Sequence, residues 1–350
     1  MKAWVLHEVD NIKYEEVDLP TPEEGQVLVQ VKAVGICGSD IPRIYKDGAH
    51  NMPLIPGHEF AGEVVEVGEK TDARWKYKRV GVYPLMPCHV CPACLSGRHE
   101  MCRNYDYLGS RRDGGFAEYV VVPEKNLIEL PDQVSYEQAA MLEPLAVAVH
   151  AMRRIGLASH DTVVVCGLGT IGLLLAMVLK QYGIKNLLAI GNKDFQKEKF
   201  LAMGFSEQNF CDVRKEEVYA WLNRNTNGLG ADAIFECVGR NETIAQAIDL
   251  AAPGGKICMV GNPYSDMTFD QKTYWKILRN QLEITGTWNS SFFTPDERND
   301  WTYALSLLKE GRIKPQQLIT RKFSLAQLDS GLHLMRDKTE DYLKVMITLG

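Results

Sequence analysis

Four cysteines between residues 88 and 102 form the densest group of metal-ligand side chains in the sequence. Pro92 within this stretch and Pro87 just before it favour a loop over a helix. Four thiolates at this spacing suit a closed, tetrahedral structural zinc site, and an iron–sulfur cluster is the alternative that uses the same ligands. A closed site has no open position for a substrate, so we expect it to fix a loop. The four ligands are Cys88, Cys91, Cys94 and Cys102.

A second set of possible ligands offers sulfur, nitrogen and oxygen, a mixture that zinc also accepts. Cys37 lies in the segment GICGSD, and His58 follows much later in GHEF. A cysteine and a histidine so far apart are usually unrelated, so their types alone do not establish a site. Glu143 lies within an apolar run, where a buried carboxylate is costly unless it is paired or bound to a metal. The alternative is an exposed carboxylate at the start of a helix, just before Pro144.

The segment VVVCGLGTIG has the order strand, glycine turn and helix that a dinucleotide-binding unit needs. The first glycine makes the tight turn, the second lets the backbone approach a pyrophosphate, and the third lets the helix pack close to the strand. N–H groups at the start of the helix then face the phosphates. The residues expected to bind the cofactor here are Gly167, Leu168, Gly169, Thr170, Ile171 and Gly172.

The end of the next strand bears on the choice of cofactor. An acidic residue there would bind the ribose 2′-hydroxyl of NAD, but this strand ends in Gly191, Asn192 and Lys193. A small residue followed by an amide and a cation favours the 2′-phosphate of NADP, and we expect Asp194 to cap the next helix instead. The cofactor-binding set is completed by Val238 and Val260.

The elements that must position these groups divide the chain into three segments. Residues 1–147 begin with alternating apolar and polar residues typical of β-structure and form the first part of a catalytic domain. Residues 148–287 form a dinucleotide-binding domain, because strands alternate with helices as in a parallel sheet covered on both faces. Residues 288–350 are too few for a domain and should return to the catalytic one. The strands expected in the middle segment are 186–190, 209–212, 231–237, 256–261 and 282–286, and a helix is expected at Asp300–Lys309.

Composition limits the classes of partner. The 350 residues are 45% hydrophobic and carry a net charge of -6, which favours neither nucleic acid nor a membrane surface. The sequence contains no apolar run long enough to span a bilayer and no signal-peptide core. Nine cysteines in such a chain indicate reduced thiols or metal ligands, and therefore a cytoplasmic protein.

Taken together and in order, these motifs resemble the zinc-dependent medium-chain dehydrogenases. The resemblance covers the whole chain and includes GICGSD (35–40), GHE (57–59), the four cysteines, GGFAEY (114–119), Glu143-Pro144 and the glycine turn. It implies an α/β protein with a GroES-like β-rich catalytic domain and a doubly wound Rossmann cofactor domain. It also implies about two zinc ions per chain, one catalytic and one structural.

The resemblance assigns further roles to single residues. Cys37, His58 and Glu143 become ligands of the catalytic zinc, and Glu59 becomes a fourth ligand, direct or through water. Asp40 resembles the carboxylate that orients the histidine ligand, and Ser39 resembles the hydroxyl of a proton relay.

Within this family, residues 37–50 and 105–119 most resemble polyol and polyol-phosphate dehydrogenases, of the galactitol-1-phosphate type first and the arabitol-phosphate type second. The expected partner is therefore a small polyol or ketose phosphate, and the expected assembly is a homodimer or homotetramer. The segment at Trp288 lacks the Arg-Tyr pair of sorbitol dehydrogenases, which counts against sorbitol. The side chains expected to bind the phosphate are Arg111 and Arg112, with Arg43 and Lys46 behind them.

Three other functions are considered. One is the dehydrogenation of an unphosphorylated polyol or a simple secondary alcohol. Another is a quinone-reductase-like activity without catalytic zinc, against which the intact set of Cys37, His58 and Glu143 argues. The third belongs to another class, a non-catalytic zinc-stabilised binding protein, which would hold metal and cofactor without turnover.

Overall fold

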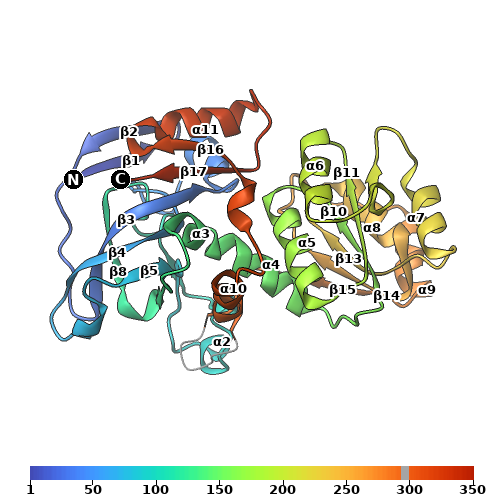
Figure 1. The fold of residues 1–350 in the computed structure, drawn as a ribbon, viewed down its shortest axis with the longest axis horizontal. Helices are drawn as coiled ribbons and strands as arrows, with labels where there is room; N and C mark the ends of the chain where they lie inside the picture. Colours follow the sequence, from blue (N-terminus) through green and yellow to red (C-terminus); the bar gives the residue numbers. More distant parts are fainter. Residues whose placement is uncertain (293–298) are drawn as a thin grey trace. The chain divides into compact units, whose positions relative to one another are not determined.

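The computed structural model describes residues 1–292 and 299–350, drawn in Figure 1. The chain forms two compact units. The first contains Met1–Ala146 and Ser290–Gly350, and the second contains Val147–Asn289. No helix in the described residues is long and apolar enough to cross a membrane.

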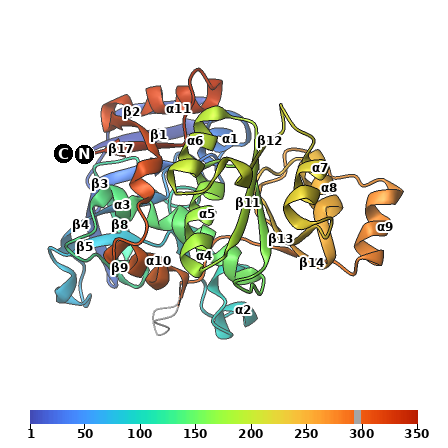
Figure 2. The same ribbon diagram turned by 45° about the vertical axis from the view of Figure 1, so that its right-hand side comes forward.

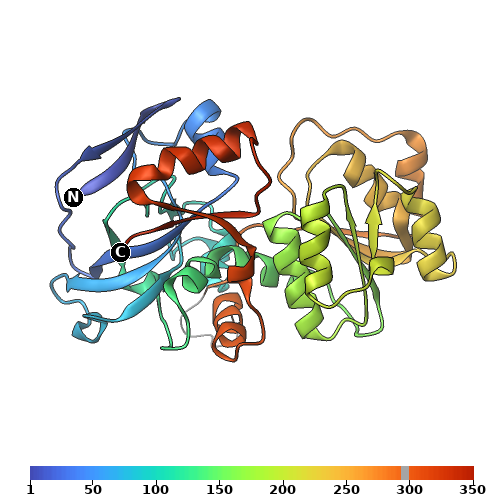
Figure 3. The same cartoon turned by 45° about the horizontal axis from the view of Figure 1, so that its top comes forward.

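The first unit is built on a seven-stranded sheet with the order β16-β17-β3-β4-β5-β9, in which β8 also pairs with β3. The chain's last strand, β17, runs antiparallel to β3, so segments from opposite ends of the sequence lie side by side (Figure 3). Apolar side chains of β3, such as Val29, Val31 and Val34, are fully buried because both faces of this strand are covered. The strands of this unit are β1 (Lys2–Glu8), β2 (Asn11–Glu16), β3 (Gln26–Ile36), β4 (Glu59–Val67), β5 (Arg79–Val82), β6 (Leu85–Met86), β7 (Asp106–Tyr107), β8 (Tyr119–Pro123), β9 (Leu127–Glu129), β16 (Ile319–Ser324) and β17 (Lys344–Thr348).

Short helices connect these strands. The α-helices are α1 (Asp40–Pro42), α2 (Pro92–Leu95), α3 (Tyr136–Ala140), α10 (Asp300–Lys309) and α11 (Leu328–Asp337), and α4 (Leu142–Arg154) continues into the second unit. Tighter turns are η2 (Ala73–Trp75), η3 (His99–Met101), η4 (Glu124–Asn126), η6 (Pro315–Leu318) and η7 (Leu325–Gln327), and η1 (Arg43–Asp47) is a π-helical turn.

The second unit is a doubly wound parallel sheet with the order β12-β11-β10-β13-β14-β15. Helices α5 and α6 cover one face, and α7, α8 and α9 cover the other (Figures 1 and 2). The order reverses beside β10, at the point where such sheets bind ligands. The elements are β10 (Thr162–Cys166), α5 (Thr170–Tyr182), β11 (Asn186–Gly191), α6 (Asp194–Ala202), η5 (Glu207–Asn209), β12 (Phe210–Asp212), α7 (Val218–Thr226), β13 (Ala231–Glu236), α8 (Asn241–Leu250), β14 (Ala251–Met259), α9 (Gln271–Arg279) and β15 (Glu283–Gly286).

Two local expectations are corrected by the structure. The strand expected at 256–261 begins earlier, at Ala251, where a register irregularity accommodates Pro253 beside β13. Asp194 is the first residue of α6 and does not cap it, since Lys193 occupies the N-cap position. The carboxylate of Asp194 binds Arg214 instead.

Candidate active site

Three of the expected metal ligands come together where β3 ends and β4 begins. These strands are antiparallel neighbours that pair Gly35 with Glu59, so Cys37 just after β3 and His58 just before β4 face the same region. One ligand atom from each of Cys37, His58 and Glu59 lies within 4.8 Å of the other two. A thiol, an imidazole and a carboxylate at this separation form a donor set that suits zinc.

Asp40 lies beside His58 at the edge of this cluster. The Asp40 carboxylate is fully buried and accepts hydrogen bonds from the Cys37 N–H at 2.9 Å and from Arg43 Nη1 at 2.6 Å. His58 Nδ1 lies 3.4 Å from Asp40 Oδ1. Burial opposes ionisation of both groups, but their mutual attraction lowers the pKa of Asp40 and raises that of His58 well above its ordinary value. With Nδ1 turned to Asp40, the other ring nitrogen is available to an ion.

The hydroxyl of Ser39 also belongs to this cluster. Its Oγ donates to Cys37 Sγ at 3.3 Å. The hydroxyl expected to relay a proton is thus in contact with a proposed ligand atom.

Lys344 forms a buried ion pair with Glu59. Its Nζ lies 2.8 Å from Glu59 Oε1 and 2.5 Å from Oε2, and it also donates to the carbonyl of Ile36 at 3.2 Å. Both side chains are almost fully buried. Burial opposes the charge on Lys344, but the negative charges of Glu59 and Cys37 raise its pKa above the ordinary value. Both oxygens of Glu59 are therefore already engaged by a cation of this chain.

Glu143 lies in the first turn of α4 and is only 7% exposed. The sequence allowed either a buried carboxylate with a partner or an exposed carboxylate at the start of a helix. Glu143 does lie at the start of a helix, but its side chain is buried. Burial raises the pKa of Glu143 to about 7, against the opposing effect of His58. Its Oε1 accepts a hydrogen bond from the Tyr107 hydroxyl at 3.4 Å. Glu143 is not among the three groups that lie within 4.8 Å of one another.

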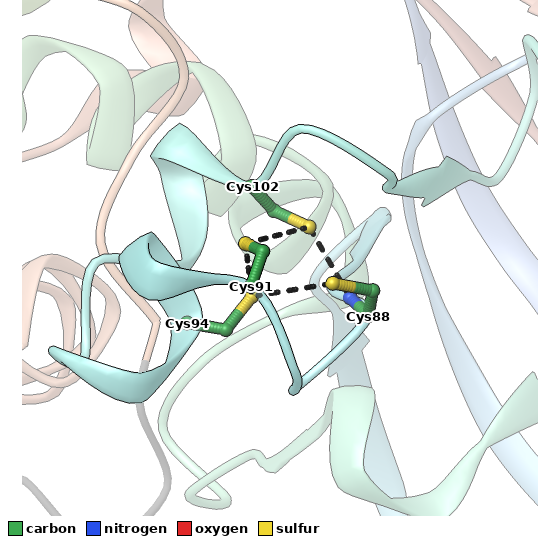
Figure 4. A group of neighbouring side chains, drawn as sticks. All are labelled: Cys88, Cys91, Cys94 and Cys102. Atoms are coloured by element: carbon green, nitrogen blue, oxygen red, sulfur yellow. Dashed lines mark hydrogen bonds between the residues drawn. The ribbon is translucent and has the colours of Figure 1, made fainter.

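The four cysteines of the 88–102 segment converge in a separate lobe (Figure 4). The Sγ atoms of Cys91 and Cys94 are 3.5 Å apart, and Cys91–Cys102 and Cys88–Cys94 are each 4.0 Å apart. A tetrahedral zinc ion with bonds of about 2.3 Å spaces its sulfurs by about 3.8 Å, so the geometry suits the ion. Backbone N–H groups donate to Cys88 and Cys91 and lower the pKa of both thiols, which favours the thiolates that a metal needs.

In the second unit, the glycine turn has the form expected for a dinucleotide-binding loop. Gly167 has φ +90°, and a Cβ at Gly172 would lie 1.9 Å from the Gly167 oxygen, so neither position tolerates a side chain. A Cβ at Gly169 would meet no atom within 4 Å. Gly169 is the N-cap of α5 and offers no side chain to cap it. Open space beside backbone at a helix N-terminus suits a pyrophosphate.

The other residues expected to contact the cofactor follow the carboxyl ends of the strands beside this turn. Val238 and Val260 follow β13 and β14, and their N–H groups donate to the side chain and the carbonyl of Glu236, respectively. Gly191 ends β11, and a Cβ there would lie 3.1 Å from the Phe210 ring. Asn192 and Lys193 continue from Gly191 to α6.

A charged cluster lies next to Gly191. Arg214 binds Asp212 through Nε at 2.8 Å and Nη2 at 2.7 Å, and it binds Asp194 through Nη2 at 2.5 Å. Asp212 pairs directly with Gly191 in the sheet. The acidic groups nearest to the tip of β11 are therefore neutralised by an arginine.

Three of the four candidate phosphate ligands are engaged by other groups. Arg43 binds Asp40, and Arg112 binds Asp106. The Arg111 guanidinium lies 4.3 Å from the centre of the Tyr105 ring, and its Nη1 donates to the Tyr105 carbonyl. Lys46 is exposed in η1. Of the four, Arg43 is linked to the cluster of Cys37, His58 and Glu59 through Asp40, which lies beside His58.

Comparison with known proteins identifies the family to which the chain belongs. The model of the alcohol dehydrogenase GroES-like domain matches residues 23–132, and that of the zinc-binding dehydrogenases matches residues 170–310. Galactitol 1-phosphate 5-dehydrogenase of Escherichia coli (strain K12) is 36% identical over 306 residues, which are 86% of each chain. The chain belongs to the zinc-dependent medium-chain dehydrogenases. This confirms the expected family and its GroES-like and Rossmann-type architecture.

Two further relatives place this dehydrogenase in the polyol branch. Sorbitol dehydrogenase of Halalkalibacterium halodurans is 32% identical over 357 residues and 99% of both chains. The crystal structure of galactitol-1-phosphate dehydrogenase from Escherichia coli has a TM-score of 0.91 and 32% identity, with full coverage of both chains. The chain is thus an oxidoreductase of the alcohol and polyol dehydrogenase family, while its relatives differ in substrate.

Two residues of the site were missed by the sequence analysis. Lys344 begins an otherwise apolar strand. A charged residue at the start of such a strand is the one sequence signal that could have suggested a buried partner. Tyr107 lies in a two-residue strand, and nothing in its local sequence indicates contact with Glu143. Both roles depend on contacts with distant parts of the chain.

Proposed function

We propose that this dehydrogenase transfers a hydride between a nicotinamide cofactor and a secondary alcohol of a polyol phosphate, giving the ketose phosphate. The observation that carries the proposal is the convergence of Cys37, His58 and Glu59, with Asp40 behind the histidine. A non-catalytic binding protein has no need of this arrangement, since the four-cysteine lobe alone suffices to stabilise a fold.

The residues divide the work at the metal centre. Cys37, His58 and Glu143 would hold a zinc ion, which would lower the pKa of a bound alcohol as it lowers that of water, from about 16 toward 7. Asp40 holds His58 in the orientation that presents Nε2 to the ion. Glu59, paired with Lys344, lies beside these residues and would contact the ion directly or through water. Ser39 Oγ, next to Cys37, accepts the proton that the substrate hydroxyl releases and passes it to solvent.

The cofactor is a nicotinamide dinucleotide, and we favour NADP over NAD. The glycine turn and the N-terminus of α5 bind the pyrophosphate. The tip of β11 has no acidic side chain to accept a hydrogen bond from a ribose 2′-hydroxyl, and Lys193 follows it. Arg214 neutralises Asp194 and Asp212, so their charges oppose a 2′-phosphate less.

Substrate identity is the finer part of the proposal. The name of the galactitol 1-phosphate relative supports a phosphorylated polyol. The substrate phosphate would be bound by one or more of the basic side chains Arg111, Arg112, Arg43 and Lys46. Arg111 stacks on the Tyr105 ring through one face of its guanidinium group, which leaves N–H donors for a phosphate. Sorbitol-type oxidation of a free polyol is the second candidate, favoured by the sorbitol relative.

A substrate panel with both cofactors tests this assignment. We expect kcat/KM to be highest for a polyol phosphate with NADP+, and the purified chain to contain about two zinc ions. Higher kcat/KM for every free polyol than for its phosphate would contradict the phosphate assignment. The catalytic function would be contradicted if the purified chain held only one zinc ion, kept that ion in a Cys37→Ser variant, and turned over no substrate of the panel.

We also propose that the protein is cytoplasmic and forms a homodimer or homotetramer. All nine cysteines are unpaired by disulfides, as expected in a reducing compartment. The edge strand β15 carries one exposed apolar side chain, Ile284, that a second copy would cover.

A further inference from the structure

Tyr107 touches two groups of the proposed metal centre without being a ligand itself. Its hydroxyl donates to Glu143 Oε1 at 3.4 Å. Its ring meets the His58 ring edge-on, with centroids 5.8 Å apart and planes at 63°. One side chain thus contacts a carboxylate from α4 and an imidazole that precedes β4.

The position of Tyr107 is set independently of these two contacts. It lies on β7, where it pairs with Leu85 of β6, and the four-cysteine lobe is inserted between the two strands. The Tyr105 ring packs edge-on against it at 6.2 Å. The side chain is therefore held by strand pairing and by packing, and it can orient the two groups that it contacts.

The two glutamates of the site differ in their partners. Glu59 uses both carboxylate oxygens to bind Lys344. The Tyr107 hydroxyl engages Oε1 of Glu143. A carboxylate that is hydrogen-bonded through one oxygen presents the other in a defined direction, which is what a metal ligand requires.

We propose that Tyr107 is a positioning residue of the catalytic metal centre. Its hydroxyl fixes Glu143 so that Oε2 faces the ion, and its ring fixes the plane of His58. This inference rests on the proposed function, because it requires His58 and Glu143 to serve a metal ion. Partners that orient metal ligands typically contribute about 10–100-fold to metal affinity or activity.

Substitution at Tyr107 separates the hydroxyl from the ring. Tyr107→Phe removes only the hydroxyl, and Tyr107→Leu removes the ring as well. Tyr342→Phe is the matched control, because it removes a hydroxyl that donates to the Met335 carbonyl at 3.3 Å. The ion of the proposed catalytic site is identified as the one that a Cys37→Ser variant lacks. Its affinity is measured by competition with a chelator. The visible spectrum is then recorded after cobalt has replaced this ion.

We expect Tyr107→Phe to weaken zinc binding by about tenfold and to shift the cobalt bands. Tyr107→Leu should weaken binding further, and Tyr342→Phe should match the wild type. In a Glu143→Gln background, the loss caused by Tyr107→Phe should shrink, because the hydroxyl no longer orients a carboxylate ligand. These readouts report on the ion itself and not only on turnover.

The outcomes distinguish the inference from the function on which it rests. If the wild type holds the ion and Tyr107→Phe binds it with unchanged affinity and spectrum, the role of Tyr107 is refuted and the proposed function stands. An equal loss with and without Glu143→Gln also refutes it, because the effect would then be general destabilisation. If the wild type holds no ion beyond that of the four cysteines, the proposed function fails, and the inference fails with it.

Discussion

Buried carboxylates at the proposed catalytic centre each have a partner that stabilises them. Asp40 binds Arg43 and lies beside His58, while Glu59 binds Lys344. Removing one partner of a buried ion pair destabilises a protein more than removing both, because the remaining charge stays buried without compensation. This asymmetry allows the pair of Glu59 and Lys344 to be tested directly.

Lys344→Met should lower the free energy of unfolding of the metal-free protein by about 3–5 kcal/mol. The physical reason is the uncompensated Glu59 carboxylate, which is 1% exposed. Adding Glu59→Gln should recover much of the loss, because no full charge then remains. Urea denaturation of the wild type, the single variants and the double variant checks this. A double variant as unstable as Lys344→Met would contradict the explanation.

Gly191→Asp should shift the ratio of kcat/KM for NAD+ and NADP+ toward NAD+, because the new carboxylate accepts a hydrogen bond from the 2′-hydroxyl and repels a 2′-phosphate. Its Cβ would lie 3.1 Å from Phe210, so the ring must move by a few tenths of an ångström. Gly191→Ala is the control, since it introduces the same steric contact without the charge. An equal shift in both variants, or none in Gly191→Asp, would refute the assignment.

At the scale of elements, the four-cysteine lobe connects β6 to β7. A metal ion held there would therefore act on the strand pair that carries Tyr107 as well as on the loop itself. A four-thiolate zinc site contributes directly to folding. The lobe and the catalytic cluster are thus connected through a two-residue strand.

Cys94→Ser should reduce the zinc content by one ion per chain and lower both the thermal midpoint and kcat. The control is Met101→Ser, which alters an exposed residue of the same lobe without removing a thiol. Metal analysis and thermal unfolding check this. Retention of the full zinc content by Cys94→Ser would show that these thiols do not hold an ion together.

Elements whose signals are local were predicted well. Helix α10 begins and ends at the expected residues, because its apolar periodicity and its capping residue lie within one short segment. The start of β14 was placed too late, since Pro253 and two glycines make its first residues look like a turn. Tertiary pairing with β13 overrides that local preference.

For the molecule as a whole, the site could be predicted only where one short segment carries its signal. The spacing of the four cysteines and the glycine turn is such a signal. Cys37, His58 and Glu143 required the resemblance to a family, because they are dispersed along the chain. Lys344 was missed because only the pairing of β17 with β3 brings it to Glu59.

The assembly is expected to bury the exposed edge of the parallel sheet. β15 is an edge strand, and its Ile284 is 41% exposed. Ile284→Lys should shift the protein toward monomer, because the charge opposes pairing of the edge with a second copy. The control is Leu229→Lys, at an exposed apolar residue away from this strand. Sedimentation analysis checks both; a wild-type monomer, or an unchanged assembly in Ile284→Lys, would contradict the expectation.

The Glu59–Lys344 pair also has a consequence for biosynthesis, since 285 positions separate its members along the chain. At about 5–20 residues per second, a ribosome exposes the glutamate roughly 15 to 60 seconds before the lysine exists. Until Lys344 is made, burial of the Glu59 carboxylate is uncompensated. We therefore expect this part of the site to close only once β17 has been synthesised.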